Sequence, residues 1–168
     1  KEKIIDGKQI KRGDVLIGLK SNGLHTNGYS LARKVLLQKF KLDEFIAELD
    51  STLGEELLKI HKSYFHSVFP LLENFSLKGI SHITGGGIIG NTKRIVPENL
   101  KIKIDWNSWN VPEIFRLIQF TGKISDDEMR EVFNLGIGMI LIVEKSLVDK
   151  IREELKTSGE ETFVIGEI

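Results

Sequence analysis

The sequence has 168 residues, enough for one domain with its own hydrophobic core. Lys and Arg together number 24, as do Asp and Glu, so the net charge is zero and gives no reason to expect a nucleic acid or an anionic membrane as a partner. There is no cysteine, which excludes disulfides, thiolate metal sites and cysteine nucleophiles, and there is no run of 18 apolar residues that could span a membrane.

The first predicted unit is a strand, a loop and a helix. Residues 14–19 are an apolar run with β-branched members, which predicts a buried strand. Residues 20–28 are polar and contain two glycines, which is typical of a loop. From Tyr29 to Phe40 the apolar residues recur at helical spacing, so we expect a helix there.

The middle of the chain is predicted to be mostly helical. Residues 42–78 carry apolar residues that would form helical faces, with Pro70 interrupting or beginning a segment and Gly79 closing it. Residues 80–84 predict a brief strand before a triple glycine. Residues 100–106 alternate apolar and charged side chains, which predicts a half-exposed strand.

Two helices are predicted next. Residues 111–120 form a short helix started by Pro112. Ser125 and Glu128 match a capping box, so a second helix begins there and runs to about Asn134.

The chain closes with strand, helix and strand. Residues 138–143 are an apolar strand, residues 146–149 cap a helix that Gly159 ends, and residues 162–168 form a last strand. Strands and helices do not alternate strictly. We therefore predict an α+β fold, a layered α/β sandwich with a mixed sheet, in one domain over residues 1–168.

The loop at residues 21–29 is the first candidate site. It joins a buried strand to a helix start, and its hydroxyl, amide and glycine groups favour an anion such as phosphate. An ordinary turn in which Thr26 or Asn27 caps the helix suits the same residues. Both interpretations stay open at this point.

The triple glycine is the second candidate site, and it nearly matches two nucleotide motifs. Gly85-x-Gly87-x-x-Gly90 fits the dinucleotide fingerprint, with Asp105 about 20 residues on, as that motif requires. However, Pro97 leaves room for too short a helix for such a crossover.

The phosphate-binding loop of nucleotide hydrolases is the other near match. Asn91 stands where that motif has its phosphate-contacting lysine, and Lys93 is two places away. We reject this motif as well. A flexible glycine hinge remains an alternative to a ligand-binding loop.

Residues 133–139 are a third candidate site. They form a predicted helix-to-strand turn in which Gly136 is expected to be left-handed, and a structural role explains this turn nearly as well as ligand contact does.

His61 and His66 are assigned to helical surface or packing positions. His25 and His82 lie in the polar loops and are better candidates for ligand contact. No histidine grouping has metal-ligand spacing, so no metal site is predicted.

These loops together resemble the C-terminal domain of the aminoimidazole ribonucleotide synthetase family, also called phosphoribosylformylglycinamidine cyclo-ligases. The resembling segments are residues 13–19, 21–31, 82–87 with 94–97, Trp109 with 112–115, 128–129 and 133–139. Each motif is modest alone, but together and in this order they are specific. The chain opens on Lys1 rather than Met, which fits part of a longer enzyme.

The resemblance implies an enzyme of de novo purine biosynthesis. It would use ATP to close formylglycinamidine ribonucleotide into aminoimidazole ribonucleotide through an iminophosphate. It also implies that ATP and Mg²⁺ are bound mainly by an N-terminal domain absent from this chain, that the full-length enzyme is a cytoplasmic homodimer, and that this part alone is inactive.

The resemblance further implies that two loops contact the substrate and its phosphate. The expected residues are Ser21, Asn22, Gly23, His25, Thr26, Asn27, Gly28 and Tyr29 in the first, and His82, Thr84, Gly85, Gly86 and Gly87 in the second. No residue is assigned as acid or base. The alternatives are a related member of the superfamily (formylglycinamidine ribonucleotide synthetase, selenophosphate synthetase or thiamine-phosphate kinase) and a non-catalytic module that binds a phosphorylated metabolite.

Overall fold

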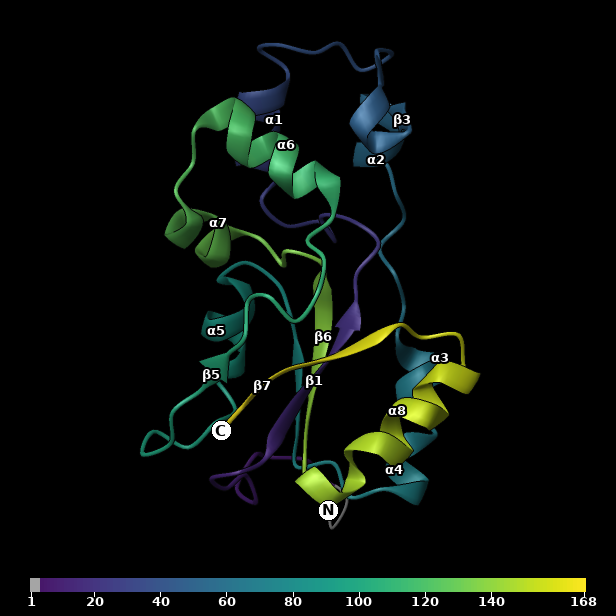
Figure 1. Ribbon diagram of the computed structural model, residues 1–168, viewed down its shortest axis with the longest axis vertical. Helices are drawn as coiled ribbons and strands as arrows, with labels where there is room; N and C mark the ends of the chain where they lie inside the picture. Colours follow the sequence, from purple (N-terminus) through teal and green to yellow (C-terminus); the bar gives the residue numbers. More distant parts are fainter. Residues whose placement is uncertain (1–3) are drawn as a thin grey trace.

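A five-stranded sheet organises the computed structural model, which describes residues 4–168 (Figure 1). Its strands follow the order β4 (Gly79–His82), β6 (Ile137–Val143), β1 (Val15–Lys20), β7 (Thr162–Glu167) and β5 (Lys103–Ile104). The four strand pairings of this sheet are all antiparallel. The α+β class and the layered arrangement are confirmed, but the strands run antiparallel rather than in mixed directions.

The described part of the chain has eight α-helices. They are α1 (Tyr29–Leu36), α2 (Leu53–Leu57), α3 (Phe65–Val68), α4 (Leu71–Asn74), α5 (Gly87–Thr92), α6 (Glu113–Gly122), α7 (Asp126–Val132) and α8 (Val148–Thr157). A second, two-stranded sheet pairs β2 (Phe45–Ile46) with β3 (Ser51–Thr52), and two 3₁₀ turns are η1 (Ala47–Leu49) and η2 (Lys145–Leu147).

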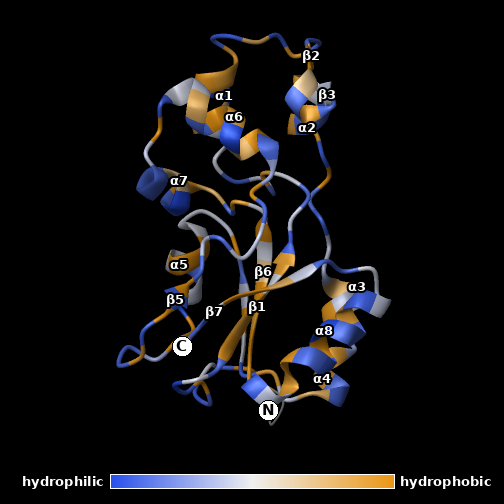
Figure 2. Cartoon of the chain, viewed as in Figure 1, coloured by the Kyte–Doolittle hydropathy of each residue, from blue (hydrophilic) through white to orange (hydrophobic). Residues whose placement is uncertain are grey.

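Both faces of the main sheet are buried, which explains the continuous apolar runs in its central strands. Ile17 and Leu141 pack with α3, α4 and α8 on one face. Leu16 and Ile142 pack with Ile88 of α5 on the other face, as the two-residue period of a strand requires. Figure 1 shows these helices on opposite sides of the sheet, and Figure 2 shows hydrophobic residues concentrated along β1.

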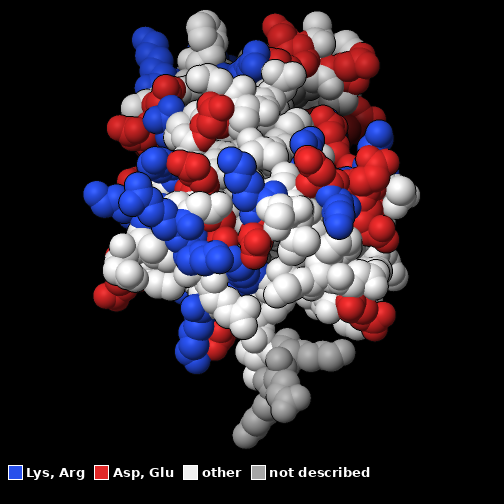
Figure 3. All heavy atoms as spheres, turned by 60° about the horizontal axis from the view of Figure 1, so that its bottom comes forward, with Lys and Arg blue, Asp and Glu red and all other residues white. Residues whose placement is uncertain are grey.

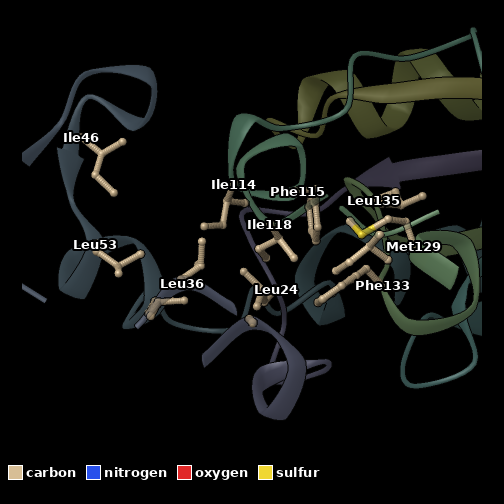
Figure 4. Close-up of a cluster of buried hydrophobic side chains, with 13 residues drawn as sticks. Leu24, Leu36, Ile46, Leu53, Ile114, Phe115, Ile118, Met129, Phe133 and Leu135 are labelled. Carbon is tan, nitrogen blue, oxygen red and sulfur yellow. The ribbon is translucent and has the colours of Figure 1, made fainter. Parts of the chain in front are cut away.

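A separate hydrophobic cluster lies beyond one end of the sheet, under α1, α6 and α7 (Figure 4). Leu24 lies in the middle of this cluster although it belongs to the first candidate loop, and it is almost fully buried. Burying a leucine side chain stabilises a fold by roughly 1.5–3 kcal/mol. The cluster therefore holds the loop against the domain.

The prediction of a mostly helical segment over residues 42–78 is wrong. That segment holds β2, β3 and three short helices instead. Asp50 takes a left-handed φ of 51°, and Thr52 caps α2 in a capping box with Glu55, so the chain turns where a long helix would continue. Pro70 does begin a helix, as predicted, since it precedes α4. Gly79 does not close a helix, because it is the first residue of β4.

Other element boundaries differ from the predicted ones by four residues or fewer. The first helix ends at Leu36, and the strand predicted at 100–106 is reduced to β5. Ser125 caps α7 as predicted, accepting a 3.3 Å hydrogen bond from the Glu128 N–H. Ser146 does not cap α8, since its hydroxyl donates to Glu144.

The surface carries both signs of charge, interspersed over the face that Figure 3 shows, in keeping with the zero net charge. Within residues 4–168, no helix is both long and apolar enough to cross a membrane.

Candidate functional site

The three candidate loops meet at one end of the main sheet. Strands β1 and β4 flank β6 and both run antiparallel to it, so β1 and β4 run in the same direction. The loops that follow them must therefore leave the sheet at the same end, where β6 begins. The register places Lys20 opposite Ile137 and His82 opposite Met139.

A direct hydrogen bond joins the first loop to the triple glycine. The Gly85 N–H donates to Oδ1 of Asn27 at 2.9 Å, and the Asn27 amide nitrogen donates to the His25 carbonyl at 2.7 Å. Residues 58 positions apart are thus coupled by one side chain. The two candidate loops are therefore in direct contact.

The first loop has an unusual backbone. His25 and Thr26 adopt left-handed φ values of 50° and 61°, and Gly28 follows at 72°. A left-handed β-branched residue such as Thr26 is a genuine outlier that costs on the order of 1 kcal/mol or more. Gly28 is required here because a Cβ would lie 2.2 Å from the Phe133 ring.

The structure decides against the capping interpretation of this loop. Helix α1 starts after Gly28, which has no side chain to cap it. The side chains of Thr26 and Asn27 both donate to the His25 carbonyl instead, at 2.6 and 2.7 Å. They hold the shape of the loop rather than the end of the helix.

Asn134 ties the third loop to the first. It is 1% exposed, accepts hydrogen bonds from the Ser21 hydroxyl at 2.9 Å and the Gly136 N–H at 2.8 Å, and donates to the Gly23 carbonyl at 2.9 Å. Ser21 is itself buried, so its hydroxyl serves this internal network. The third loop therefore acts as a support for the first.

Asn91 shapes the triple-glycine loop from inside. It is 4% exposed, and its amide nitrogen donates to the carbonyls of Thr84, Gly85 and Gly87, while its oxygen accepts from the Thr84 hydroxyl at 2.9 Å. Helix α5 has only six residues. These findings confirm the rejection of both nucleotide motifs, because the residue in the lysine position is internal scaffold and the helix is short.

The three consecutive glycines, residues 85–87, differ in what a side chain at each position would meet. A Cβ at Gly87 would lie 1.8 Å from the Arg130 carbonyl oxygen, so Gly87 is needed for packing against α7. Within the described part of the chain, a Cβ at Gly85 would meet only Asn27 Oδ1, at 3.9 Å. Gly86 has a left-handed φ of 103°, and a Cβ there would lie 3.8 Å from an Arg94 guanidinium nitrogen. Arg94 is an exposed cation outside the residues predicted to line the site.

His61 contacts a histidine from each of the two candidate loops, His25 and His82. The rings of His25 and His61 stack with centroids 4.2 Å apart and an interplanar angle of 21°, and Nε2 of His61 lies 3.2 Å from Nε2 of His82. His61 lies between α2 and α3, outside any helix, so its assignment to a helical surface is wrong. Its position in sequence carries no motif that would have placed it in the site. His66 lies on α3 and is exposed, as expected.

Asn22 and Tyr29 fix the edges of the first loop. The Asn22 amide nitrogen donates to the Ile60 carbonyl at 2.8 Å, which turns its oxygen toward His25 Nε2 at 2.6 Å. The Tyr29 hydroxyl donates to the Leu57 carbonyl at 2.5 Å, and burial raises its pKa. These contacts anchor the loop to the last residue of α2 and to the segment that follows it.

Burial favours the neutral forms of His25 and His61. It lowers the pKa of His25 to about 4, with further contributions from His61, His82 and Lys62. Burial and the neighbouring His82 also lower the pKa of His61. At neutral pH these imidazoles therefore act as hydrogen-bond donors and acceptors rather than as cations.

Mg²⁺ does not fit this set of residues. The two loops contain no carboxylate, whereas Mg²⁺ is held by carboxylate and other oxygen ligands. Residues 4–168 also hold no group of three or more His, Asp or Glu side chains that could bind a metal ion. The fold and site thus define an α+β domain whose polar and glycine-rich loops form its candidate ligand-binding surface.

The chain belongs to the family described as AIR synthase related protein, C-terminal domain, which matches residues 11–168. It is 50% identical over 168 residues to a phosphoribosylformylglycinamidine cyclo-ligase of Pseudothermotoga lettingae, covering all of this chain and 50% of the relative. It is 48% identical to the protein of the same name from Thermodesulfovibrio yellowstonii, covering 99% and 49%. The chain spans about half the length of the curated relatives it matches.

Solved structures share the fold at low identity. Thiamine-monophosphate kinase from Stenotrophomonas maltophilia K279a matches with a TM-score of 0.62 at 13% identity, over 97% of this chain and 49% of that one. The structure titled T. maritima PurL complexed with FGAR matches with a TM-score of 0.59 at 15% identity, over 99% and 25%. These similarities support the predicted fold class.

Proposed function

We propose that this chain is the substrate-facing, C-terminal part of an ATP-dependent cyclo-ligase that makes aminoimidazole ribonucleotide from formylglycinamidine ribonucleotide. The observation that carries the proposal is the identity of 48–50% across essentially the whole chain to proteins named for that activity. The hydrogen-bonded pair of polar loops supports it with a surface suited to a polar, phosphate-bearing ligand.

The proposed reaction has two steps. The amide oxygen of the substrate takes the γ-phosphoryl group of ATP, and ADP leaves. A nearby amine nitrogen then attacks the resulting iminophosphate, loses a proton and expels inorganic phosphate. Such chemistry depends mainly on positioning and charge neutralisation. We assign to the two loops the binding and orientation of the substrate and its phosphate, with Arg94 as a nearby cation.

ATP and Mg²⁺ are proposed to bind mainly to a partner half of the protein. The titles of similar T. maritima PurL structures name complexes with AMPPCP and ADP, which supports nucleotide binding in this fold. The loops here offer no carboxylate for Mg²⁺. We further propose an N-terminal ATP-binding domain, a homodimer and a cytoplasmic location for the full-length protein, and no turnover by this chain alone.

The alternatives are less well supported. Identities of 13–15% to thiamine-monophosphate kinase and PurL are far below those to the cyclo-ligases. A non-catalytic binding module would also use these loops. Calorimetry of the 168-residue chain with formylglycinamidine ribonucleotide separates the cases, since tight binding by the chain alone favours a module and weak binding favours half of a site.

The activity test uses the full-length protein with ATP and formylglycinamidine ribonucleotide, following aminoimidazole ribonucleotide. We expect turnover by the unmodified protein and a tenfold to hundredfold lower kcat/KM for Asn27→Ala, roughly the loss of one positioning hydrogen bond that costs about 1–3 kcal/mol. Asn110→Ala, which changes an exposed residue, is the matched control. No product from the unmodified protein would refute the function, whereas normal turnover by both Asn27→Ala and His82→Ala would refute the site.

A further inference from the structure

His61 completes a chain of hydrogen-bonding groups that runs between the two loops. Its Nδ1 lies 3.4 Å from the Thr26 hydroxyl oxygen, and its Nε2 lies 3.2 Å from Nε2 of His82. Its ring is held in place by stacking on His25, which is 3% exposed. Each nitrogen of the half-buried His61 ring therefore faces one defined partner.

The Thr26 hydroxyl sets the direction of this chain. A hydroxyl has one hydrogen to donate and two lone pairs. The Thr26 hydroxyl lies 2.6 Å from the His25 carbonyl, which can only accept, so its hydrogen is used there. Toward His61 the hydroxyl oxygen can then act only as an acceptor. The hydrogen in the 3.4 Å contact must come from Nδ1 of His61.

A neutral imidazole carries only one N–H, so this assignment decides the second contact. With its hydrogen on Nδ1, His61 presents a bare lone pair at Nε2. The 3.2 Å contact then requires His82 to donate from its own Nε2. In the neutral form of His82, Nδ1 is consequently the bare nitrogen. Burial favours the neutral form of His61, because it lowers the pKa of that side chain.

We propose that His61 is a positioning residue that fixes His82 in the Nε2–H tautomer and leaves Nδ1 of His82 as a proton acceptor in the candidate site. The hydrogen-bond assignment stands independently of the reaction; only the identity of the chemistry that His82 serves rests on the proposed function. His61 itself is placed behind His82 and is not assigned a contact with substrate.

The tautomers can be read directly by NMR. The ¹⁵N-labelled 168-residue chain at pH 8, above the ordinary histidine pKa of about 6.5, should show His61 with hydrogen on Nδ1 and a bare Nε2, and His82 with the reverse pattern. The Nδ1–H form is the minor tautomer of a free histidine side chain, so finding it at His61 requires a specific partner. His61 as Nε2–H, or His82 as Nδ1–H, would overturn the proposal.

Two variants of Thr26 test the cause. Thr26→Val keeps the shape but removes the acceptor, so His61 should lose its Nδ1–H preference and the His82 signals should change with it. Thr26→Ser keeps a hydroxyl and should retain the unmodified pattern. An unchanged His61 tautomer in Thr26→Val would also overturn the proposal. If Thr26→Val fails to fold, the spectrum of the unmodified chain decides alone. Since no substrate is present, failure here is distinguishable from failure of the proposed function.

Discussion

Replacing Asn134 with alanine should destabilise the domain through the network that supports the first loop. The side chain is 1% exposed and makes hydrogen bonds to the Ser21 hydroxyl, the Gly136 N–H and the Gly23 carbonyl at 2.8–2.9 Å. Alanine offers none of these groups. Water has little access to the site, so solvent would not replace these bonds.

The size of the effect follows from these three bonds. A typical intramolecular hydrogen bond contributes about 1 kcal/mol net, and a buried group left without a partner costs about 1–3 kcal/mol. Three bonds give about 3 kcal/mol, near the upper end of ordinary single substitutions. Part of this is recovered if the Ser21 hydroxyl, which also lies 3.3 Å from the Gly23 carbonyl, donates there instead. We therefore expect a loss of about 2–3 kcal/mol.

Equilibrium unfolding in urea measures this free energy, from the midpoint at an unchanged slope. Asn110→Ala is the control, since its side chain is exposed and its effect should stay within about 0.5 kcal/mol. If Asn134→Ala unfolds within 0.5 kcal/mol of the unmodified chain, the network does not stabilise the loop and the reasoning is wrong.

Two further predictions concern the same region. Gly87→Ala should lower the free energy of unfolding, measured by thermal denaturation, by more than about 1 kcal/mol, because the new Cβ would lie 1.8 Å from the Arg130 carbonyl oxygen and Gly87 has a left-handed φ. Gly90→Ala is the control and should be neutral or stabilising, because a Cβ there meets open space in the described structure. Equal effects of the two changes would contradict this packing argument. The pKa of His25 is about 4 when folded and about 6.5 when unfolded, so the unfolded chain takes up a proton first as pH falls, and the free energy of unfolding should drop by about 2 kcal/mol between pH 7 and pH 5. This part of the drop should be missing in His25→Gln and present in His66→Gln; an unchanged drop in His25→Gln would remove His25 as its cause.

Much of the main sheet was predictable from local sequence. The apolar runs at residues 14–19 and 138–143 predict strands buried on both faces, and β1 and β6 are such strands. Ser125 predicts the start of α7 because a cap depends only on residues within one turn. Asn91 and Pro97 excluded the nucleotide motifs for reasons that are likewise local.

The segment 42–78 shows where local patterns stop being sufficient. Apolar residues at helical spacing fit one long helix as well as several short ones, and the choice depends on which surfaces the rest of the fold offers. Here Leu53 packs in the cluster beyond the sheet, whereas Val68 and Leu71 pack on the sheet face. One straight helix could not reach both, so the chain breaks between them.

Local sequence was enough to identify the two candidate loops, because their glycine, hydroxyl and amide groups and their place next to a predicted strand can be recognised without knowing the fold. That these two loops lie in contact depends on the tertiary structure. Strand direction is a property of the whole sheet, and β1 and β4 deliver their loops to the same end because both lie antiparallel to β6. Tertiary packing also brings His61, from the segment between α2 and α3, beside His82: 21 residues separate them in sequence, but their Nε2 atoms lie 3.2 Å apart.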